Sequence, residues 1–234
     1  MEQAESNIKN HKRETTTILS FIEKPLLNFL AARLPNYFTP DILTGIGLIG
    51  SFITALGYYL SSYSSYYLWL ASLGLIVNWF GDSLDGTVAR YRHIEKPKYG
   101  FFIDHTLDSL SMVAVGIGVG LSPYARFDLV LLALVTYLLM SILVYVRTFV
   151  NGVFKISYYG FGPTEVRIFI ILLNTLMFYF GAYEVSYGEQ VYTIIDLGAI
   201  FLSIVLFLMF VSSVILDGKK LKQEELKAIH HNNF

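Results

Sequence analysis

The sequence predicts an all-α integral membrane protein with six transmembrane helices preceded by an amphipathic juxtamembrane helix. Hydrophobic residues make up 54% of the 234 residues and charged residues only 15%, whereas soluble domains average about a quarter charged residues. The apolar residues fall in six runs, each close to the ~20 residues that a bilayer-spanning helix needs. The basic residues are also distributed very unevenly between alternate loops. These three observations exclude a soluble globular domain.

Composition also narrows the classes of function. The formal net charge is −1, so no overall basic field favours a nucleic-acid partner, and none is expected. The chain contains no cysteine, which excludes disulfides, thiolate metal sites and cysteine nucleophiles.

The first element expected is the juxtamembrane helix, within a polar N-terminal segment of residues 1–40. This segment has no apolar core followed by a small-residue cleavage site, so it does not resemble a signal peptide. From about Ile18 to Leu34, apolar pairs alternate with charged and polar residues, a pattern typical of an amphipathic helix on the membrane surface. We expect this helix to be interrupted near Pro25. A linker helix of another kind is the alternative interpretation.

The six apolar runs follow, separated by short turn-rich or charged segments. The spans are expected at about 41–60, 66–84, 101–122, 127–147, 166–183 and 191–215. Aromatic residues such as Trp69 crowd the ends of the spans, as in an interfacial belt. The spans define a six-helix domain at 41–216 and a polar cytoplasmic tail at 217–234, in which we expect His230 and His231 to be disordered.

The basic residues predict the orientation. Of the 17 Lys and Arg residues, only Arg126 lies on one side of the six-span topology. The others lie before the first span, after the second, after the fourth and after the sixth. The positive-inside rule then places both termini in the cytoplasm, which requires an even number of spans. We expect a multi-pass protein of the cell (inner) membrane.

The residues that carry chemistry lie between the second and third spans. The chain reads Asp82-Ser-Leu-Asp85-Gly86-Thr-Val-Ala89-Arg90 and then Gly100-Phe-Phe-Ile-Asp104-His-Thr-Leu-Asp108. At 100° per residue, the named positions of each motif fall on one face of a helix. If the two helices are antiparallel neighbours, the two acidic stripes can face each other.

Such a cluster of acids needs neutralisation. An aspartate in a membrane helix costs about 2.5–3.5 kcal/mol on insertion scales, and carboxylates that are ~5 Å apart also repel each other. One or two divalent cations would turn this repulsion into ligation, and hard oxygen donors select Mg²⁺, Mn²⁺ or Ca²⁺ over zinc. Gly86, Ala89 and Gly100 leave the helix faces bare for a ligand, and Arg90 suits a phosphate. The alternative interpretation is a solvated loop face beside ordinary helix-packing glycines.

These motifs resemble the pattern of the CDP-alcohol phosphotransferase (CDP-alcohol phosphatidyltransferase) family, D-x-x-D-G-x-x-A-R followed by G-x-x-x-D-x-x-x-D. The resemblance covers about residues 15–216 and fills all eight fixed positions. It implies a membrane transferase of phospholipid biosynthesis that moves a substituted phosphate from a CDP-linked donor to an alcohol hydroxyl and releases CMP. It also implies dependence on Mg²⁺ or Mn²⁺, with one or two ions bound, and a homodimer.

The resemblance assigns roles to individual residues. The metal ligands would be Asp82, Asp85, Asp104 and Asp108. Asp108 would also be the general base. The nucleotide contacts would come from Gly86, Ala89, Arg90 and Gly100. The site would open to the cytoplasmic leaflet.

The motifs are compatible with two pairs of donor and acceptor. Family members use either CDP-diacylglycerol with a small alcohol, which we favour, or a soluble CDP-alcohol with diacylglycerol. At the entry to the first span, Asp41 stands where the family usually has Asn, so a nucleotide contact from this position is in doubt. The runs Ile103-Asp104-His105 and Gly162-Pro163-Thr164-Glu165 resemble the aminoalcohol branch, the choline and ethanolamine phosphotransferases.

Four further residues are candidates for binding an acceptor or donor headgroup. Arg147, Lys155 and Arg167 could bind a phosphorylated acceptor such as glycerol phosphate, although they also fit simple positive-inside flanking charge. In the aminoalcohol alternative, Glu165 would instead partner a donor ammonium group. A more remote alternative is a cation transporter, because acids inside membrane helices also mark ion pathways. A transport site would lie near the midplane, whereas these acids cluster at one face.

Overall fold

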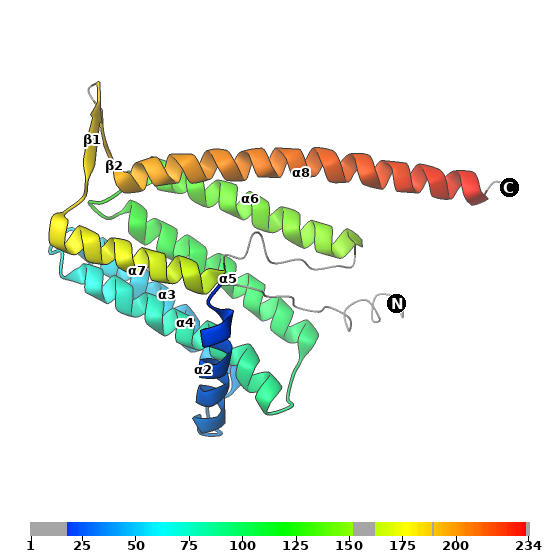
Figure 1. The fold of residues 1–234 in the computed structure, drawn as a ribbon, viewed down its shortest axis with the longest axis horizontal. Helices are drawn as coiled ribbons and strands as arrows, with labels where there is room; N and C mark the ends of the chain where they lie inside the picture. The colour runs from blue at the N-terminus through cyan, green and yellow to red at the C-terminus, as the bar shows by residue number, and fades with distance from the viewer. Residues whose placement is uncertain (1–17, 152–161, 189, 233–234) are drawn as a thin grey trace.

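The structure is a computed structural model that describes residues 18–151, 162–188 and 190–232 (Figure 1). The described chain is almost entirely helical. Its elements are α2 (Ser20–Arg33), α3 (Pro40–Leu60), α4 (Tyr67–Tyr91), α5 (Pro97–Gly120), α6 (Phe127–Asn151), α7 (Pro163–Phe180), β1 (Glu184–Tyr187), β2 (Gln190–Thr193) and α8 (Ile194–Asn232). Helices α3 to α8 each coincide with one of the six expected spans.

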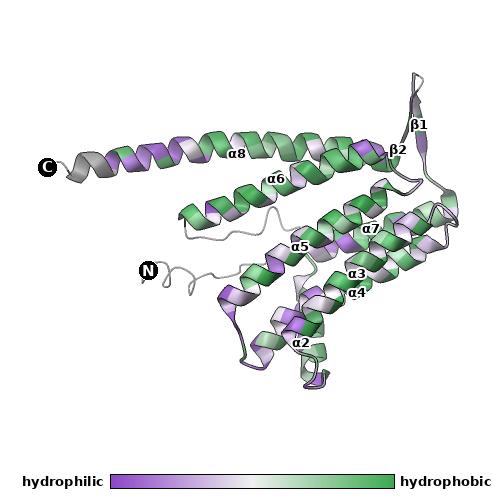
Figure 2. Ribbon diagram, turned by 180° about the vertical axis from the view of Figure 1, so that it is seen from behind, coloured by the Kyte–Doolittle hydropathy of each residue, from purple (hydrophilic) through white to green (hydrophobic). Residues whose placement is uncertain are grey.

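Five of these six helices are long and apolar enough to cross a membrane, namely α3, α5, α6, α7 and α8. Figure 2 shows apolar residues along most of their length. Helix α4 falls outside this set because polar residues in its second half, among them Asn78, Asp82 and Asp85, lower its hydropathy. The structure therefore agrees with a multi-pass, all-α membrane fold, and α4 is the helix that carries the acids.

Local sequence explains where several helices begin. Proline occupies the first position of α3, α5 and α7, where its missing N–H costs no hydrogen bond and its fixed φ suits the helix. The Thr39 hydroxyl caps α3 by accepting a hydrogen bond from the Ile42 amide at 3.3 Å. The Glu165 side chain caps α7 by accepting one from the Gly162 amide at 3.0 Å.

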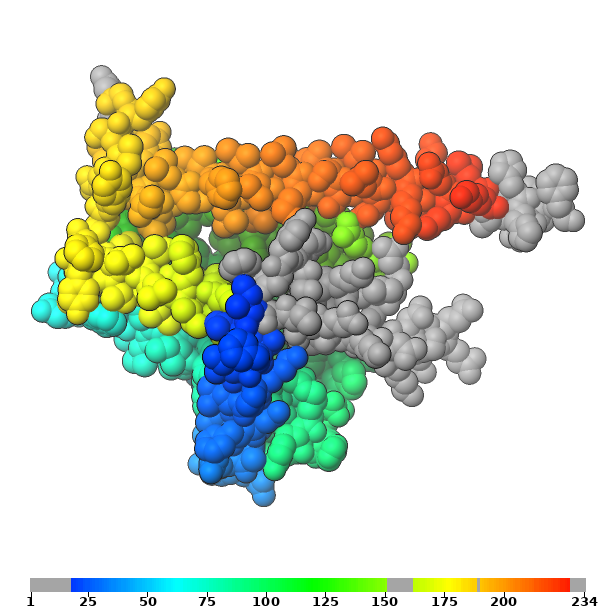
Figure 3. All heavy atoms as spheres, in the orientation of Figure 1, coloured from blue at the N-terminus to red at the C-terminus, as the bar shows by residue number. Residues whose placement is uncertain are grey.

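The helices pack as a series of neighbours, in the order α7, α4, α3, α5, α6 and α8. Helix α2 crosses the second half of α4, and it lies on the outside of the bundle at the end away from the β1–β2 hairpin (Figures 1 and 3). A small apolar core there joins α2 to α3 and α4. Its buried members are Leu27, Ala31, Leu43, Leu84 and Val88.

Helices α3 and α4 approach each other closely because glycines line both sides of their contact. A Cβ atom at Gly81 would lie 2.2 Å from the Gly47 nitrogen, and one at Gly50 would lie 2.3 Å from the Asn78 nitrogen. No side chain fits at either distance, so only glycine permits this approach. The contact fixes the backbone of α4 immediately before Asp82.

A buried polar network joins three helices near the C-terminal end of α3 and the N-terminal end of α4. The Tyr58 hydroxyl donates to Asn174 Oδ1 at 2.8 Å, and Asn174 Nδ2 donates to the Ser72 hydroxyl at 3.1 Å. These residues belong to α3, α7 and α4 and are all buried. Because an unmatched polar group would be costly in this position, the network fixes the position of α7 on the other two helices.

Three local expectations are corrected by the structure. Helix α2 runs through Pro25 without interruption. Helix α8 continues as one helix to Asn232, across the expected boundary at 216, so His230 and His231 lie in a helix and not in a disordered tail. The segment before α8, expected only as a turn-rich connection, forms an antiparallel hairpin in which Glu184 pairs with Thr193.

Candidate functional site

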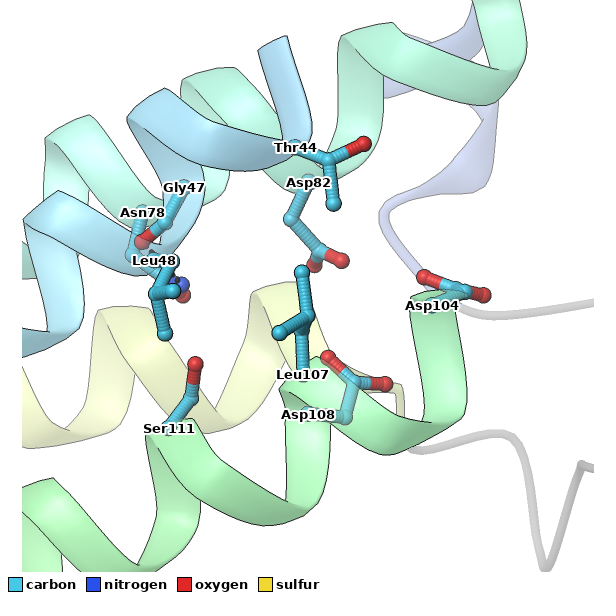
Figure 4. A pocket seen from close by; sticks show the side chains of 9 residues that line it. All are labelled: Thr44, Gly47, Leu48, Asn78, Asp82, Asp104, Leu107, Asp108 and Ser111. Atoms are coloured by element: carbon cyan, nitrogen blue, oxygen red, sulfur yellow. Dashed lines mark hydrogen bonds between the residues drawn. The ribbon is translucent and has the colours of Figure 1, made fainter. Parts of the chain in front are cut away.

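Three of the four expected aspartates come together between α4 and α5. Asp82 on α4 and Asp104 and Asp108 on α5 each place a carboxylate oxygen within 4.8 Å of the other two. Figure 4 shows the Asp82 and Asp108 side chains pointing toward each other from facing helices. One acid of the expected α4 stripe, Asp82, thus converges with the two acids of α5, whereas Asp85 is not part of this group.

The acids line a pocket between three helices. Its lining residues are Thr44, Gly47 and Leu48 of α3, Asn78 and Asp82 of α4, and Asp104, Leu107, Asp108 and Ser111 of α5 (Figure 4). Helix α5 packs mainly on α3 and α6. Helix α3 contacts both α4 and α5. The acids of α4 and α5 therefore lie on two sides of the pocket, and residues of α3 line it between them.

Asp85 lies beside this group but has different partners. Its Oδ2 accepts a hydrogen bond from the Thr44 hydroxyl of α3 at 2.7 Å, and its Oδ1 accepts one from the Gly86 amide at 2.5 Å. Asp85 is thus held toward α3, one helical turn beyond Asp82. Thr44 of α3 is therefore the hydrogen-bond partner of one of the four motif acids.

A cation already lies against the cluster. Arg167, in the first turns of α7, donates from Nη2 to Asp82 Oδ2 at 2.5 Å and from Nε to Asn78 Oδ1 at 2.9 Å. The Arg167 side chain is only 14% exposed. Asn78 in turn donates to the Gly47 carbonyl at 2.9 Å, which fixes its amide orientation. Arg167 therefore partly neutralises the acids from the α7 side.

Three of the residues expected to contact a nucleotide lie near the C-terminal end of α4, and the fourth, Gly100, lies near the start of α5. Arg90 lies along the Gly86 face, because a Cβ at Gly86 would be 3.2 Å from Arg90 Nη1. Arg90 Nη2 also donates to the Thr87 hydroxyl at 3.2 Å. Ala89 is half-buried on the same helix. On α5, a Cβ at Gly100 would meet nothing within 4 Å, so a ligand can approach the backbone there.

The other expected residues are placed differently. Arg147 of α6 pairs with Asp217 of α8, with Nε donating to Oδ2 at 2.7 Å. Lys155 lies outside the described residues. Glu165 accepts hydrogen bonds from the backbone amides of Leu19 and Gly162. Among the three candidates that the structure describes, Arg167 has a hydrogen bond to an acid of the cluster, Asp82.

Sequence reasoning missed Asn78. It lies one helical turn before Asp82, at a spacing of four residues that puts both on the same face of α4. A polar residue at that spacing inside an apolar run was the available signal.

The chain is similar in sequence and in fold to several known proteins. A family model described as CDP-alcohol phosphatidyltransferase matches residues 37–216. The archaetidylinositol phosphate synthase of Pyrococcus horikoshii is 33% identical over 103 residues, which are 44% of this chain and 52% of that protein. Cholinephosphotransferase 1 of Danio rerio is 28% identical over 173 residues, covering 70% of this chain and 43% of that protein.

Two further similarities involve phosphatidylinositol phosphate synthases. The enzyme of Cutibacterium acnes is 38% identical over 92 residues, covering 38% of this chain and 41% of that protein. The chain thus spans about half, or less, of the length of the curated relatives it matches. A crystal structure of the Mycobacterium tuberculosis enzyme with CDP-DAG bound matches with a TM-score of 0.53 and 22% identity, over 83% of this chain and 90% of that one.

Proposed function

The chain belongs to the CDP-alcohol phosphatidyltransferase family, and from that premise we propose that it transfers a substituted phosphate from a CDP-linked donor to an alcohol hydroxyl. CDP-diacylglycerol is the favoured donor and CMP the leaving group. The observation that carries the proposal is the convergence of Asp82, Asp104 and Asp108 around one pocket. The names of three matched proteins support this donor, because all three are synthases of inositol phosphate lipids and one of them has CDP-DAG bound.

The donor atoms of the cluster fit a hard divalent cation. All three groups are carboxylates, and their oxygens lie within 4.8 Å of one another. Ligands on opposite sides of a Mg²⁺ ion are ~4.2 Å apart, twice the usual ~2.1 Å bond length, so small side-chain rotations suffice to close the set. Asp85 is the fourth family position and lies one turn away. When bound, Mg²⁺ or Mn²⁺ would offset the negative charge of the carboxylates and of the donor pyrophosphate.

The chain's own residues account for the remaining steps. An acceptor hydroxyl in the pocket loses its proton to a carboxylate oxygen of Asp108, the exposed member of the cluster. The alcohol oxygen forms a bond to the β-phosphorus of the donor, which carries the group to be transferred. The bond from this phosphorus to the oxygen shared with CMP breaks, and CMP leaves. Gly86, Ala89 and Gly100 allow the nucleotide to approach the helix backbones, and Arg90 faces its phosphates.

Arg167 suits a phosphorylated acceptor. A phosphate dianion entering this pocket would meet carboxylates, and the Arg167 guanidinium is positioned to offset that repulsion. The phosphorylated acceptor is therefore the version of the proposal that the site favours.

A second candidate is an aminoalcohol phosphotransferase acting on diacylglycerol. The longest sequence match, over 173 residues, is to a cholinephosphotransferase, and the Gly162-to-Glu165 run resembles that branch. Both carboxylate oxygens of Glu165 accept backbone amides, so a donor ammonium group would have to share them.

The proposal includes an arrangement in the membrane. Helix α4 would cross the membrane together with the five helices named above, which makes six spans, and the acids would lie near the cytoplasmic face of the cell membrane. Helix α2 would lie in the interface, because Phe21, Ile22 and Phe29 are exposed on its outer side while Leu27 and Ala31 are buried against the bundle. A homodimer is expected from the family.

The experiment that tests the function measures CMP release. Purified protein in lipid or detergent is incubated with Mg²⁺, a CDP-linked donor and a panel of acceptors. CDP-diacylglycerol with a phosphorylated alcohol is the pair expected to give the fastest release. Release only from CDP-choline or CDP-ethanolamine with diacylglycerol would favour the second candidate. No release from any pair would overturn the proposal.

A further inference from the structure

The first turns of α2 and α7 are joined by two reciprocal glutamates. Glu23 of α2 accepts a hydrogen bond at Oε1 from the Thr164 hydroxyl of α7 at 2.6 Å. Glu165 of α7 accepts one at Oε1 from the Leu19 amide, at the N-terminus of α2, at 2.9 Å. Each helix start thus supplies an acceptor to the other, across more than 140 residues of sequence. We refer to Glu23 and Glu165, with their donors Thr164 and Leu19, as the clasp.

The clasp is also attached to α4. The Glu23 Oε1 atom accepts from Trp79 Nε1 at 2.9 Å and from the Ser83 hydroxyl at 3.5 Å. Trp79 and Ser83 are four residues apart and so share a face of α4. Glu23 therefore joins three helices through one carboxylate oxygen.

The neighbouring face of α4 is the one that holds Arg167. Asn78 and Asp82 immediately precede Trp79 and Ser83 in the sequence, and both accept from the Arg167 guanidinium. On α7, Arg167 lies three residues after Thr164 and therefore on a neighbouring part of the same helix face. One pair of α4 residues holds Glu23, and the adjacent pair holds the cation at the acid cluster.

We propose that Glu23 is a positioning residue that, through the clasp, holds the first turn of α7 in register on α4 and thereby keeps the Arg167 guanidinium on Asp82. Glu23 itself does not contact the pocket. This inference rests on the proposed function, because it assigns Arg167 the role of the fixed cation of a divalent-metal and phosphate site. It extends that function to the juxtamembrane helix, which the family motifs do not include.

The positioning role and a simple charge effect predict opposite changes in Mn²⁺ affinity when Glu23 is removed. Glu23 is negative, so its removal by itself would weaken the binding of a cation nearby. If Glu23 instead keeps Arg167 in place, its removal releases a positive charge from the cluster, and Mn²⁺ binds more tightly. The sign of the change therefore separates positioning from bulk electrostatics.

The test measures Mn²⁺ binding to the purified full chain by electron paramagnetic resonance, with no substrate present. Arg167→Gln is expected to lower the Mn²⁺ Kd by about tenfold, within the range of interaction free energies between contacting groups. Glu23→Ala is expected to lower it by about threefold to tenfold by the same rule. In the Arg167→Gln background, Glu23→Ala should change the Kd by less than about twofold, because its effect passes through Arg167.

The Mn²⁺ Kd of three further variants tests the positioning role even if Glu23→Ala folds poorly. Glu23→Gln keeps an acceptor oxygen and should remain close to the original Kd. Thr164→Val removes one donor of the clasp and should shift the Kd in the same direction as Glu23→Ala. Asn28→Ala, an exposed position on α2, is the matched control and should change nothing. In a Trp69→Phe background, Trp79 is the remaining tryptophan, and its emission reports whether the clasp has opened.

The outcomes distinguish the inference from the function on which it rests. Tighter Mn²⁺ binding in Glu23→Ala and Thr164→Val that disappears in the Arg167→Gln background supports the positioning role. Unchanged or weaker binding in these variants, or an effect that adds to that of Arg167→Gln, overturns it while leaving the proposed function intact. If the original chain binds no Mn²⁺, the metal site and the proposed function fail together.

Discussion

At the scale of single residues, three of the four aspartates have clearly different surroundings and so should respond differently to substitution. Asp82 pairs with Arg167, Asp85 accepts from Thr44, and Asp108 is the exposed member of the three that converge. An exposed carboxylate at the pocket is the one best able to exchange a proton with an entering hydroxyl.

Asp108→Asn should therefore abolish turnover more than binding. The amide keeps the size of the side chain but cannot accept the proton, so CMP release should fall by about 10²–10⁴-fold, the usual contribution of a general base. Binding of the CDP-linked donor should survive in part, as measured with a labelled donor in the presence of Mn²⁺. Asp128→Asn, whose exposed side chain pairs with Arg126 outside the site, is the matched control. Near-normal turnover in Asp108→Asn would show that another group is the base.

Arg167→Gln should affect the acceptor more than the donor. If Arg167 binds an acceptor phosphate, its loss should raise the acceptor KM by about tenfold or more, since charge-assisted hydrogen bonds are worth about 1.5–3 kcal/mol. The donor KM should change little. Steady-state CMP release at varied glycerol phosphate and varied CDP-diacylglycerol measures both. An equal rise in both constants would argue against an acceptor subsite at this residue.

Asp82→Asn should shift the metal requirement. It removes one of the three converging carboxylates, so the Mg²⁺ concentration for half-maximal CMP release should rise severalfold, because a charged ligand is replaced by a neutral one. Titration with Mg²⁺ in the presence of both substrates gives this value. Asp128→Asn again serves as the control, and an unchanged Mg²⁺ dependence in Asp82→Asn would contradict its role as a ligand.

At the scale of the secondary-structure elements, the α3–α4 contact positions the site and depends on glycine. Gly81→Ala should destabilise the protein, because its Cβ would lie 2.2 Å from the Gly47 nitrogen and must push the two helices apart. The cost expected for overpacking is about 1–3 kcal/mol, and activity should fall as well because Asp82 is the next residue. Thermal unfolding in detergent measures the first effect and CMP release the second.

The matched control lies on the same helix pair. A Cβ at Gly45 would meet nothing within 4 Å, so Gly45→Ala should be neutral or slightly stabilising, because alanine favours a helix over glycine. Equal thermal stability of the Gly45→Ala and Gly81→Ala variants would contradict the close-packing explanation.

The helices could be predicted from the sequence because each apolar run is close to the length of a membrane-spanning helix. Local features that depend on tertiary contacts could not. Pro25 lacks one backbone N–H near the start of α2, but the packing of Leu27 and Ala31 on the bundle outweighs that loss and the helix continues. The β1–β2 hairpin is held by distant partners, since the Thr193 hydroxyl of β2 donates to the Tyr124 carbonyl at 2.7 Å.

The same distinction holds for the site. The acid stripes were predictable because helical periodicity places residues four apart on one face. The contact of Arg167 with Asp82 spans 85 residues and that of Glu165 with Leu19 spans 146. No periodicity within a single element indicates such pairs, so the clasp and the cation of the cluster required the three-dimensional structure.

At the scale of the whole molecule, the two ends of the bundle differ in chemistry. The acids of the pocket lie in the second half of α4 and the first half of α5, beside the loop that contains Arg92 and Lys96. The hairpin and Arg126 lie at the other end, where Arg126 Nη1 donates to the Gln190 side chain at 2.8 Å. In the proposed membrane arrangement, an ionic substrate would reach the pocket from the face that carries this basic loop.

This asymmetry predicts which residues are accessible from each side of the membrane. The chain has no cysteine of its own, so single cysteines can be introduced and labelled with an impermeant maleimide in sealed vesicles of known orientation. Lys96→Cys and Lys222→Cys should be labelled only from the cytoplasmic side, because the excess of basic residues lies there. Tyr63→Cys and Tyr187→Cys, at residues that are 74% and 82% exposed at the opposite end, should be labelled only from outside. Each variant should first retain CMP release, which shows that it is folded. Labelling of positions 96 and 63 from the same side would mean that α4 does not cross the membrane, and the pocket would then lose its proposed access from the cytoplasm.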